Sequence, residues 1–376
     1  MEIEGLSILK TLVLMDTSTG KSTLPLAEYV ADVLASKYTV KLLGEGEKNL
    51  VAYNDAAKKQ VQKGQHYFAF CGHMDTVPAD QSQWKISPFE LHLENDKYFG
   101  LGTSDMKGPI SCMISALLNN DPCLPAGLIL TYDEEGAMSG ANYLVENCKE
   151  TLQGIQLIIG EPTSFRLGYM HKGFSHYVFS VTGKGGHSSL PEQGLNAVYA
   201  AADFTQAIAH LSKIFSTQSN NGSTPTLNVG KISGGDVVNR VAEKAIVEFE
   251  ARYTADKPPQ ELEDLLEGKK VLYESQGYTC SLALQSEQPA AYTDKDSIFI
   301  RLLSYLSKQQ PTLLDFATDA SIFNGRGEIP CAILGPGNIN VCHQPNEYIT
   351  RADLLTAEKL YADILESQIE GLSLTR

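Results

Sequence analysis

Six side chains that could bind a metal ion or transfer a proton lie at comparable places along the chain, each after an apolar run or in a glycine-rich turn. They are His73, Asp105, Glu134, Glu135, Glu161 and His343. Imidazole nitrogens and carboxylate oxygens are common ligands of divalent metals. Two histidines and three carboxylates would suffice for a pair of metals, and the remaining glutamate, Glu134, could act as a base beside them. The set therefore predicts metal-assisted hydrolysis.

Three apolar runs of strand length explain how side chains so distant in sequence could meet. We predict strands over residues 66–71, 127–132 and 155–159. His73 follows the first run, Glu134 the second and Glu161 the third, each at a distance of two residues. In an open α/β sheet, the loops at the carboxyl ends of the strands converge on one crevice. A single histidine or acidic pair after a strand is usually structural, but several at corresponding strand ends favour a shared site.

The other two ligands are placed by glycine-rich turns. Asp105 lies in such a loop just before a predicted helix over residues 108–119, and His343 follows a predicted strand over 329–334 and its glycine turn. Asp75 stands two residues after His73, where its carboxylate could accept the second N–H of that imidazole. Such a contact would fix the tautomer of the ligand and raise its basicity, so we predict a supporting role for Asp75.

Strands and helices alternate up to about residue 172 and resume near residue 329, a pattern typical of an α/β layer with a mostly parallel sheet. Helical spacing is clearest over 24–36 and 351–370. With 376 residues, the chain is longer than one hydrophobic core usually supports, so we predict two domains. The first domain is formed by residues 1–174 and 286–376.

Residues 175–285 interrupt this pattern and predict a second, inserted domain. The expected order is strand, helix, two strands, helix and strand, over residues 175–182, 193–213, 224–232, 240–254, 258–277 and 279–285. This β-α-β-β-α-β order is that of the ferredoxin-like α+β unit. A polar run over 216–223 predicts a loop within it. Inserted domains of this kind commonly act as lids.

The composition argues against several other classes of protein. The formal net charge of −15 would repel nucleic acid and anionic lipid. Apolar stretches stay well below the roughly eighteen residues of a membrane span, and the N-terminus lacks the layout of a secretory signal, so we expect no membrane partner and a cytoplasmic location. The seven cysteines form no C-x-x-C pair, which favours reduced thiols over a disulfide framework.

Over nearly its whole length, the sequence resembles the dinuclear zinc amidohydrolases, a family that includes acetylornithine deacetylases, succinyl-diaminopimelate desuccinylases, aminoacylases and glutamate carboxypeptidases. The resemblance is carried by the motifs GHMDTVP (72–78), YFGLGTSDMKG (98–108), DEE (133–135), GEPTS (160–164), GHSS (186–189) and CHQP (342–345). It implies a zinc-exopeptidase-like catalytic domain and an inserted ferredoxin-like domain that serves as a lid and as a dimerisation surface. The expected assembly is a homodimer.

The same resemblance implies a role for each residue of the site. Asp105 would bridge two divalent metals, with His73 and Glu161 completing one coordination set. Glu135 and His343 would complete the other, and Glu134 would be the general base. Zinc is the expected metal, with cobalt and manganese as alternatives, because sites of this kind accept all three.

The resemblance also assigns a catalytic role to a histidine of the inserted domain. His187 would stabilise the oxyanion of the tetrahedral intermediate when the lid closes, and in dimeric members of the family this histidine comes from the other subunit. From the residues alone, His187 reads equally well as an ordinary loop histidine.

Three stretches resemble the acetylornithine deacetylase branch: residues 171–173, 225–240 and 335–348. This implies hydrolysis of N2-acetyl-L-ornithine to L-ornithine and acetate, a reaction of arginine biosynthesis. The chain departs from that branch at Asp319, where a glutamate is common, and at Cys342, where a small residue is common. A desuccinylase or a dipeptidase on the same scaffold is the alternative. A non-catalytic amino-acid-binding protein is disfavoured, since the base and all five ligands are present.

An N-acyl amino acid also needs an anchor for its carboxylate. The candidates for substrate binding are Lys172, Asn239, Arg240, Arg252, Gly335 and Gly337. A guanidinium group can bind a carboxylate through two hydrogen bonds, and backbone N–H groups in a glycine turn can do the same work. Arg252 reads equally well as a partner in a surface ion pair.

Overall fold

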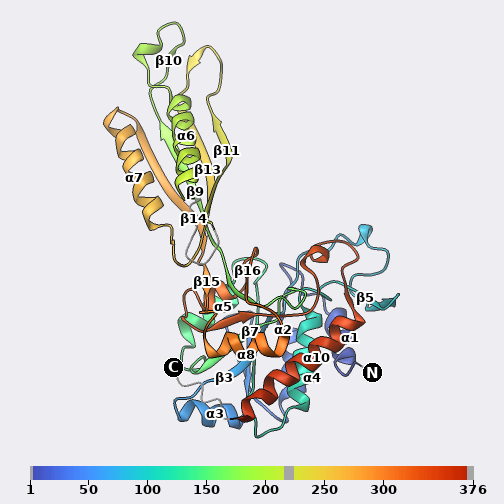
Figure 1. Cartoon of the computed structure of the whole chain (residues 1–376). Coiled ribbons are helices and arrows are strands. Elements are labelled where there is room, and N and C mark those ends of the chain that lie inside the picture. The colour runs from blue at the N-terminus through green and yellow to red at the C-terminus, as the bar shows by residue number, and fades with distance from the viewer. Residues whose placement is uncertain (1–2, 216–223, 371–376) are drawn as a thin grey trace. The chain divides into compact units, whose positions relative to one another are not determined.

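The structure is a computed structural model that describes residues 3–215 and 224–370. The chain divides into two compact units, one formed by residues 1–170 and 292–376 and the other by residues 171–291 (Figure 1). The sequence pattern predicted the inserted segment over 175–285. The predicted loop at 216–223 lies outside the described residues.

A nine-stranded mixed sheet forms the centre of the first unit. Its order is β1-β2-β6-β3-β7-β17-β8-β15, with β16 beside β8. The strands are β1 (Thr39–Leu43), β2 (Asn49–Tyr53), β3 (Tyr67–His73), β6 (Gly127–Thr131), β7 (Ile155–Ile159), β8 (Gly168–His171), β15 (Ala291–Tyr292), β16 (Thr312–Leu314) and β17 (Cys331–Ile333). Where β6, β3, β7 and β17 lie side by side, every pair is parallel, whereas β1, β2 and β8 pair antiparallel.

The central strands confirm the predicted α/β class with a parallel centre. Every residue of β3, β6 and β7 is buried, as is usual for the parallel strands of an α/β sheet. One boundary differs from the prediction: β3 extends to His73, since this residue still pairs in register with Thr131 of β6. The imidazole therefore projects from the last residue of a strand, not from the loop beyond it.

The helices of this unit lie along the sheet (Figure 1). They are α1 (Leu6–Leu14), α2 (Leu24–Leu34), α3 (Asp55–Gln62), α4 (Lys107–Asn119), α5 (Ser139–Asn147), α8 (Ile298–Ser307), α9 (Ala320–Phe323) and α10 (Arg351–Glu366). Helix α4 packs against α1 and α10 and is buried over most of its length. Helix α10 begins at a capping box, in which Thr350 and Asp353 satisfy each other's backbone N–H groups. A 3-10 turn, Ser367–Glu370, ends the predicted helical segment.

A small three-stranded sheet lies beside the loop that carries Asp105. Its order is β18 (Tyr348–Thr350), β5 (Lys97–Phe99) and β4 (His92–Glu94), all antiparallel. Strand β5 leads into the glycine-rich loop, and β18 follows the loop that carries His343. The pairing of β18 with β5 therefore brings these two distant segments of the chain together.

The second unit has the predicted ferredoxin-like fold. Its elements are β9 (Gly173–Thr182), β10 (Gly186–His187), α6 (Ala197–Phe215), β11 (Thr226–Gly234), β12 (Arg240–Val241), β13 (Lys244–Tyr253), α7 (Gln260–Ser275) and β14 (Thr279–Gln288). The main sheet is antiparallel in the order β11-β13-β9-β14, and β10 pairs with β12 apart from it. The predicted strand over 240–254 is thus two strands.

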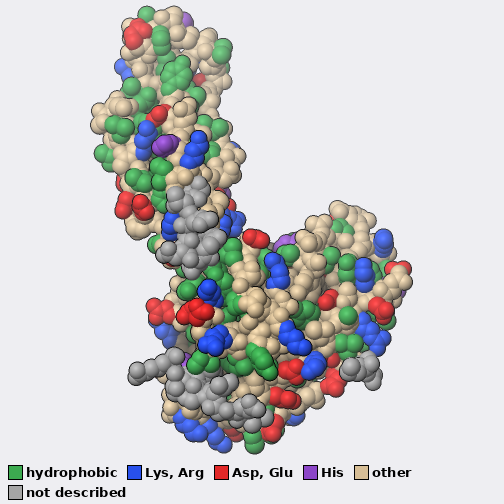
Figure 2. Space-filling model, in the orientation of Figure 1, with side chains coloured by type: hydrophobic (Ala, Val, Ile, Leu, Met, Phe, Trp, Pro, Cys, Tyr) green, Lys and Arg blue, Asp and Glu red, His purple; other side chains and the backbone are tan. Residues whose placement is uncertain are grey.

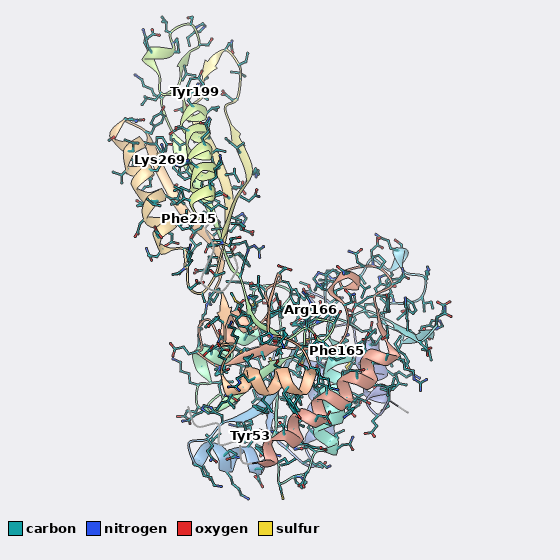
Figure 3. The ribbon with its side chains drawn as sticks, viewed as in Figure 1. Tyr53, Phe165, Arg166, Tyr199, Phe215 and Lys269 are labelled. Atoms are coloured by element: carbon teal, nitrogen blue, oxygen red, sulfur yellow. The ribbon has the colours of Figure 1, made fainter. Side chains whose placement is uncertain are left out.

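Aromatic side chains form the core of the second unit. Phe179 of β9 stacks on Phe204 of α6 with ring centroids 3.8 Å apart, and Tyr273 of α7 packs against both rings. Lys269 of α7, labelled in Figure 3, forms an ion pair of 2.8 Å with Asp203. These contacts bind both helices to one face of the sheet.

The surface carries mixed charge. On the face in Figure 2, acidic and basic side chains alternate without forming a continuous basic patch. Over the described residues, no helix combines the length and the apolar character that crossing a membrane requires.

Candidate metal centre

His73 is the buried imidazole of the site. Its Nε2 lies 3.0 Å from Oδ1 of Asp105, and its Nδ1 lies 2.8 Å from the backbone oxygen of Asp75. A carbonyl oxygen can only accept, so Nδ1 carries the donating proton. This leaves Nε2 as the atom that could bind a metal after losing its own proton.

Asp75 supports the site through atoms other than those predicted. Its carboxylate oxygen is 3.8 Å from Nδ1 of His73, too far for a hydrogen bond, and the backbone carbonyl of Asp75 takes that place. The carboxylate instead accepts the N–H groups of Glu134 and Glu135, at 3.1 Å each. Asp75 therefore holds the first turn of the loop that carries the predicted base.

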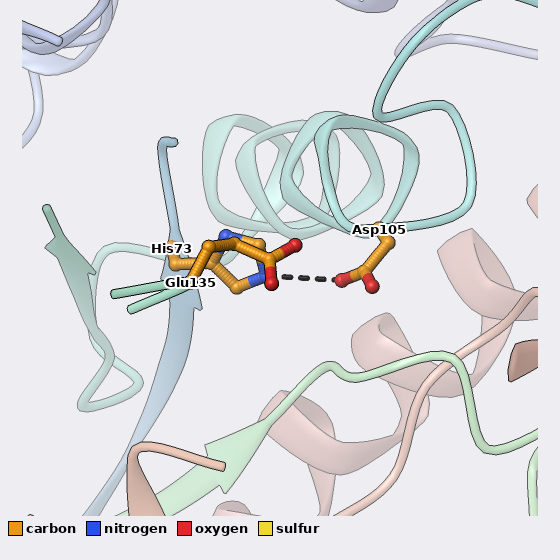
Figure 4. Close-up of side chains that lie close together, drawn as sticks. All are labelled: His73, Asp105 and Glu135. Carbon is orange, nitrogen blue, oxygen red and sulfur yellow. Dashed lines mark hydrogen bonds and ion pairs between the residues drawn. The ribbon is translucent and has the colours of Figure 1, made fainter. Parts of the chain in front are cut away.

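Asp105 presents one carboxylate oxygen to each of two histidines. Oδ1 contacts His73, while Oδ2 lies 3.5 Å from Nε2 of His343. The same Nε2 lies 2.8 Å from Oε1 of Glu135. Figure 4 shows His73, Asp105 and Glu135 converging on one point, and their possible ligand atoms lie within 4.8 Å of one another. The Asp105 carboxylate thus lies between the two imidazoles.

Glu161 and Glu134 complete the acidic cluster. Burial, and then the negative charge of Asp105, raise the pKa of Glu161 well above its usual value. Burial also raises the pKa of Glu134 well above its usual value, although the charge of His73 partly offsets this effect. Each glutamate is thus close enough to His73 or Asp105 for their charges to shift its pKa.

The acidic side chains around the two imidazoles favour the binding of additional positive charge. Burial lowers the pKa of His73, but the hydrogen bond to Asp105 and the neighbouring carboxylates outweigh it and raise that pKa well above its usual value. Hydrogen bonds to Asp105 and Glu135 raise the pKa of His343 to about 10. Both imidazoles therefore hold protons beside the carboxylates of Asp105 and Glu135. Divalent cations can replace these protons, so the donor set fits a pair of metals of the zinc, cobalt or manganese class.

The glycine turn after β17 supports the loop that follows Glu161. Thr163 donates its hydroxyl to the Gly335 carbonyl at 3.2 Å, and the Ser164 N–H donates to the Gly337 carbonyl at 2.8 Å. Phe165 and Arg166, labelled in Figure 3, follow in the same loop. The N–H of Gly335, predicted as a substrate anchor, already donates to Thr163 Oγ1 at 3.2 Å.

Asp319, where the sequence departs from the expected glutamate, lies in the same unit. Its side chain is buried, and one oxygen accepts the hydroxyl of Thr131 at 2.6 Å. Burial raises the pKa of Asp319 to about 7. Asp319 lies immediately before the short helix α9, and no spacing rule marks a residue there as a neighbour of Thr131 on β6.

The remaining predicted residues belong to the second unit. His187 lies on β10, pairs in register with Arg240 of β12, and holds the Ser189 hydroxyl at 2.7 Å from Nδ1. The Asn239 carbonyl accepts the N–H of Ser188 at 3.2 Å. The structure thus groups His187, Asn239 and Arg240 around one small ribbon.

The two arginines of this unit have acidic partners. Arg240 contacts Asp236 at 2.9 Å and Glu243 at 3.0 Å, while Arg252 contacts Glu250 at 2.8 Å. Arg252 also lies 5.0 Å from the ring centroid of Phe174. A substrate carboxylate would have to compete with these contacts. Lys172, at the start of the unit, is partly exposed.

The sequence is similar to those of known proteins over most of its length. The chain is 33% identical to acetylornithine deacetylase of Proteus mirabilis over 79% of this chain and 78% of that protein. It is 31% identical to the enzyme of the same name from Pasteurella multocida, covering 90% of each.

Solved structures agree with the fold. Aminopeptidase PepT of Bacillus cereus superposes with a TM-score of 0.78 at 18% identity, covering 98% of each chain. The M20 family metallo-carboxypeptidase Sso-CP2 of Sulfolobus solfataricus gives a TM-score of 0.71 at 19% identity, covering 98% of this chain and 99% of that one. The model of one family matches residues 69–367, most of the chain. The chain belongs to peptidase family M20/M25/M40.

Proposed function

We propose that this protein is a metal-dependent amidohydrolase that cleaves the N-acyl amide of an N-acyl amino acid, with N2-acetyl-L-ornithine as its substrate and L-ornithine and acetate as products. The observation that carries the proposal is the placement of Asp105 between His73 and His343. The names of the relatives support the choice of substrate and a place in arginine biosynthesis.

In this proposal, two groups of side chains hold two divalent metals. His73 and Glu161 would hold one, Glu135 and His343 would hold the other, and Asp105 would serve both. Bound divalent metals act as Lewis acids on the scissile carbonyl and lower the pKa of water. Zinc is the proposed metal, and cobalt and manganese suit the same nitrogen and oxygen donors.

Glu134 is the proposed general base. Its backbone N–H is held by Asp75, and burial raises the pKa of its carboxyl group. A carboxylate with a raised pKa is a better proton acceptor. Glu134 takes a proton from the attacking water and delivers it to the amine nitrogen as the C–N bond breaks. The products are a carboxylate and a free amino acid.

Further parts of the proposal rest on the family resemblance. His187 of the inserted domain stabilises the oxyanion of the intermediate, and two chains associate through that domain as a homodimer. Lys172, Asn239, Arg240, Arg252 and the turn at Gly335 and Gly337 are the proposed substrate-binding residues. The protein acts in the cytoplasm, without a nucleic acid or membrane partner.

The test is a comparison of kcat/KM for three substrates with the zinc-reconstituted protein. N2-acetyl-L-ornithine should exceed N-succinyl-diaminopimelate and simple dipeptides by at least tenfold. A preference for the succinyl substrate or for dipeptides would move the protein to another activity on the same scaffold. Absence of amide hydrolysis with zinc, cobalt and manganese alike would refute the enzyme assignment.

A further inference from the structure

Glu347 is a buried carboxylate with no place in the mechanism above. Its residue is 2% exposed, and it lies between the loop of His343 and strand β18. Its Oε1 accepts the N–H groups of Ser104 at 2.7 Å and of Asp105 at 3.0 Å. Its Oε2 accepts the N–H of Gly102 at 2.9 Å. One side chain thus binds three backbone donors of a single loop.

This loop needs such an acceptor. Residues 100–106 are buried and connect β5 to α4 without regular secondary structure. Buried backbone N–H groups must find an acceptor, and the two side-chain oxygens of Glu347 provide one for three of them. The three bonds fix the backbone at Asp105 itself, and so they limit where its carboxylate can lie.

Glu347 also belongs to the segment that carries the other ligand. It follows His343 by four residues, and its own carbonyl accepts the N–H of Gly100 at 3.1 Å. The Asn338 N–H, from the start of the same segment, donates to the Ser104 hydroxyl at 3.1 Å. The segment that carries His343 is therefore hydrogen-bonded to the loop of Asp105 near both of its ends, at Asn338 and at Glu347. The connection at Glu347 is the buried one.

We propose that Glu347 is a positioning residue that sets the spacing between Asp105 and His343 and thereby the affinity of the protein for metal. The proposal rests on the metal centre described above. Ligand positions must be held within a few tenths of an ångström for tight binding. Partners behind the ligands typically account for about 10- to 100-fold in metal affinity or activity.

The experiment replaces Glu347 by glutamine and measures zinc affinity by competition with a chromophoric chelator. The amide keeps the size of the side chain but turns its NH₂ group toward backbone donors. E347Q should bind zinc about 10- to 100-fold more weakly. Added zinc should restore most of kcat, and the absorption spectrum of the cobalt-loaded variant should change. Wild-type affinity in a folded E347Q protein would overturn the proposal.

Glu358 provides a matched control. This glutamate of α10 accepts the backbone N–H groups of Gly5 at 2.6 Å and of Glu4 at 3.3 Å, both in the N-terminal segment of the described chain. E358Q should lower the melting temperature of the metal-free protein without changing zinc affinity. An equal loss of affinity in E358Q and E347Q would reduce Glu347 to a general structural role and overturn the proposal.

A second variant covers the case in which E347Q does not fold. E347D keeps the carboxyl group but shortens the side chain, and it should also weaken zinc binding. Wild-type zinc affinity in E347D would count against the proposal. Failure of the wild-type protein to bind any divalent metal is a separate outcome, because it would refute the metal centre itself.

Discussion

The two imidazoles of the site differ in their access to water. His73 is 1% exposed in its side chain, whereas His343 is 49% exposed, yet both contact the same carboxylate of Asp105. A ligand open to water loses its metal more readily than a buried one. In the proposed centre, the metal that Glu135 and His343 would hold is therefore expected to exchange faster than the one that His73 and Glu161 would hold.

Protons compete with metal at these imidazoles. Hydrogen bonds to Asp105 and Glu135 raise the pKa of His343 to about 10, so this group is protonated at neutral pH before metal binds. Metal binding must release that proton, and the apparent affinity should rise as the pH increases toward 10. Titration calorimetry in buffers of different ionisation enthalpy measures the released protons. Binding without proton release at pH 7 would contradict this assignment.

Replacement of Glu134 separates metal binding from turnover. E134Q removes the proton acceptor but none of the five proposed ligands, so the variant should retain both metals. Its kcat should fall by about 10²- to 10⁴-fold, the usual contribution of a general base. Metal analysis and steady-state kinetics on the same sample measure both effects. A variant with wild-type turnover would remove Glu134 from its proposed role.

Residue types and spacing predicted which groups would meet but not every contact among them. His73, Asp105, Glu135 and His343 do converge. Spacing could not show that the backbone carbonyl of Asp75 accepts the hydrogen bond of the imidazole while its carboxylate accepts the N–H of Glu134, since both acceptors belong to the same residue. Glu347 was also beyond prediction, because its partners are backbone N–H groups from a distant loop.

At the scale of secondary structure, continuous burial made the central strands easy to predict. Strand β7 covers the predicted residues, and β6 differs from its prediction by one residue. The pairing that extends β3 to His73 and the break between β12 and β13 depend on contacts with other strands. A pattern read along one segment does not contain such contacts.

A substitution in the glycine turn after β17 tests whether this turn holds Glu161 in place. A Cβ atom at Gly335 would lie 2.2 Å from the carbonyl oxygen of Gly160 and 2.5 Å from that of Glu161, so backbone must move. G335A should displace Glu161 and lower metal affinity and kcat/KM by roughly 10- to 100-fold.

Gly268 offers the matched control for this substitution. It lies in helix α7, and a Cβ atom there would meet nothing within 4 Å. G268A should leave activity unchanged and stabilise the protein by up to about 1 kcal/mol. Full activity in G335A would show that the turn tolerates the shift and that Glu161 does not depend on it.

At the scale of the whole molecule, the proposed reaction depends on both units. H187A should reduce kcat by about 10²- to 10³-fold, the usual cost of one oxyanion donor, while metal content stays unchanged. His210, exposed on helix α6 of the same unit, gives a control in H210A, which should retain activity. Equal kcat values for H187A and the wild type would exclude the inserted domain from the chemistry.

The two-unit organisation was predictable because the order of elements changes abruptly near residue 175. The fold of the insertion followed from the β-α-β-β-α-β order, and its main sheet has the order β11-β13-β9-β14. The small β10–β12 ribbon was missed, since two-residue strands leave no periodic pattern.

The chain leaves the first unit through β8 and returns through β15, and these two strands are neighbours in the same sheet. Adjacent strands lie about 5 Å apart, so a short turn can span the gap. The insertion thus begins and ends at two adjacent strands of the sheet. Its deletion, or its replacement by an unrelated domain, should therefore leave the strand pairing of the first unit intact.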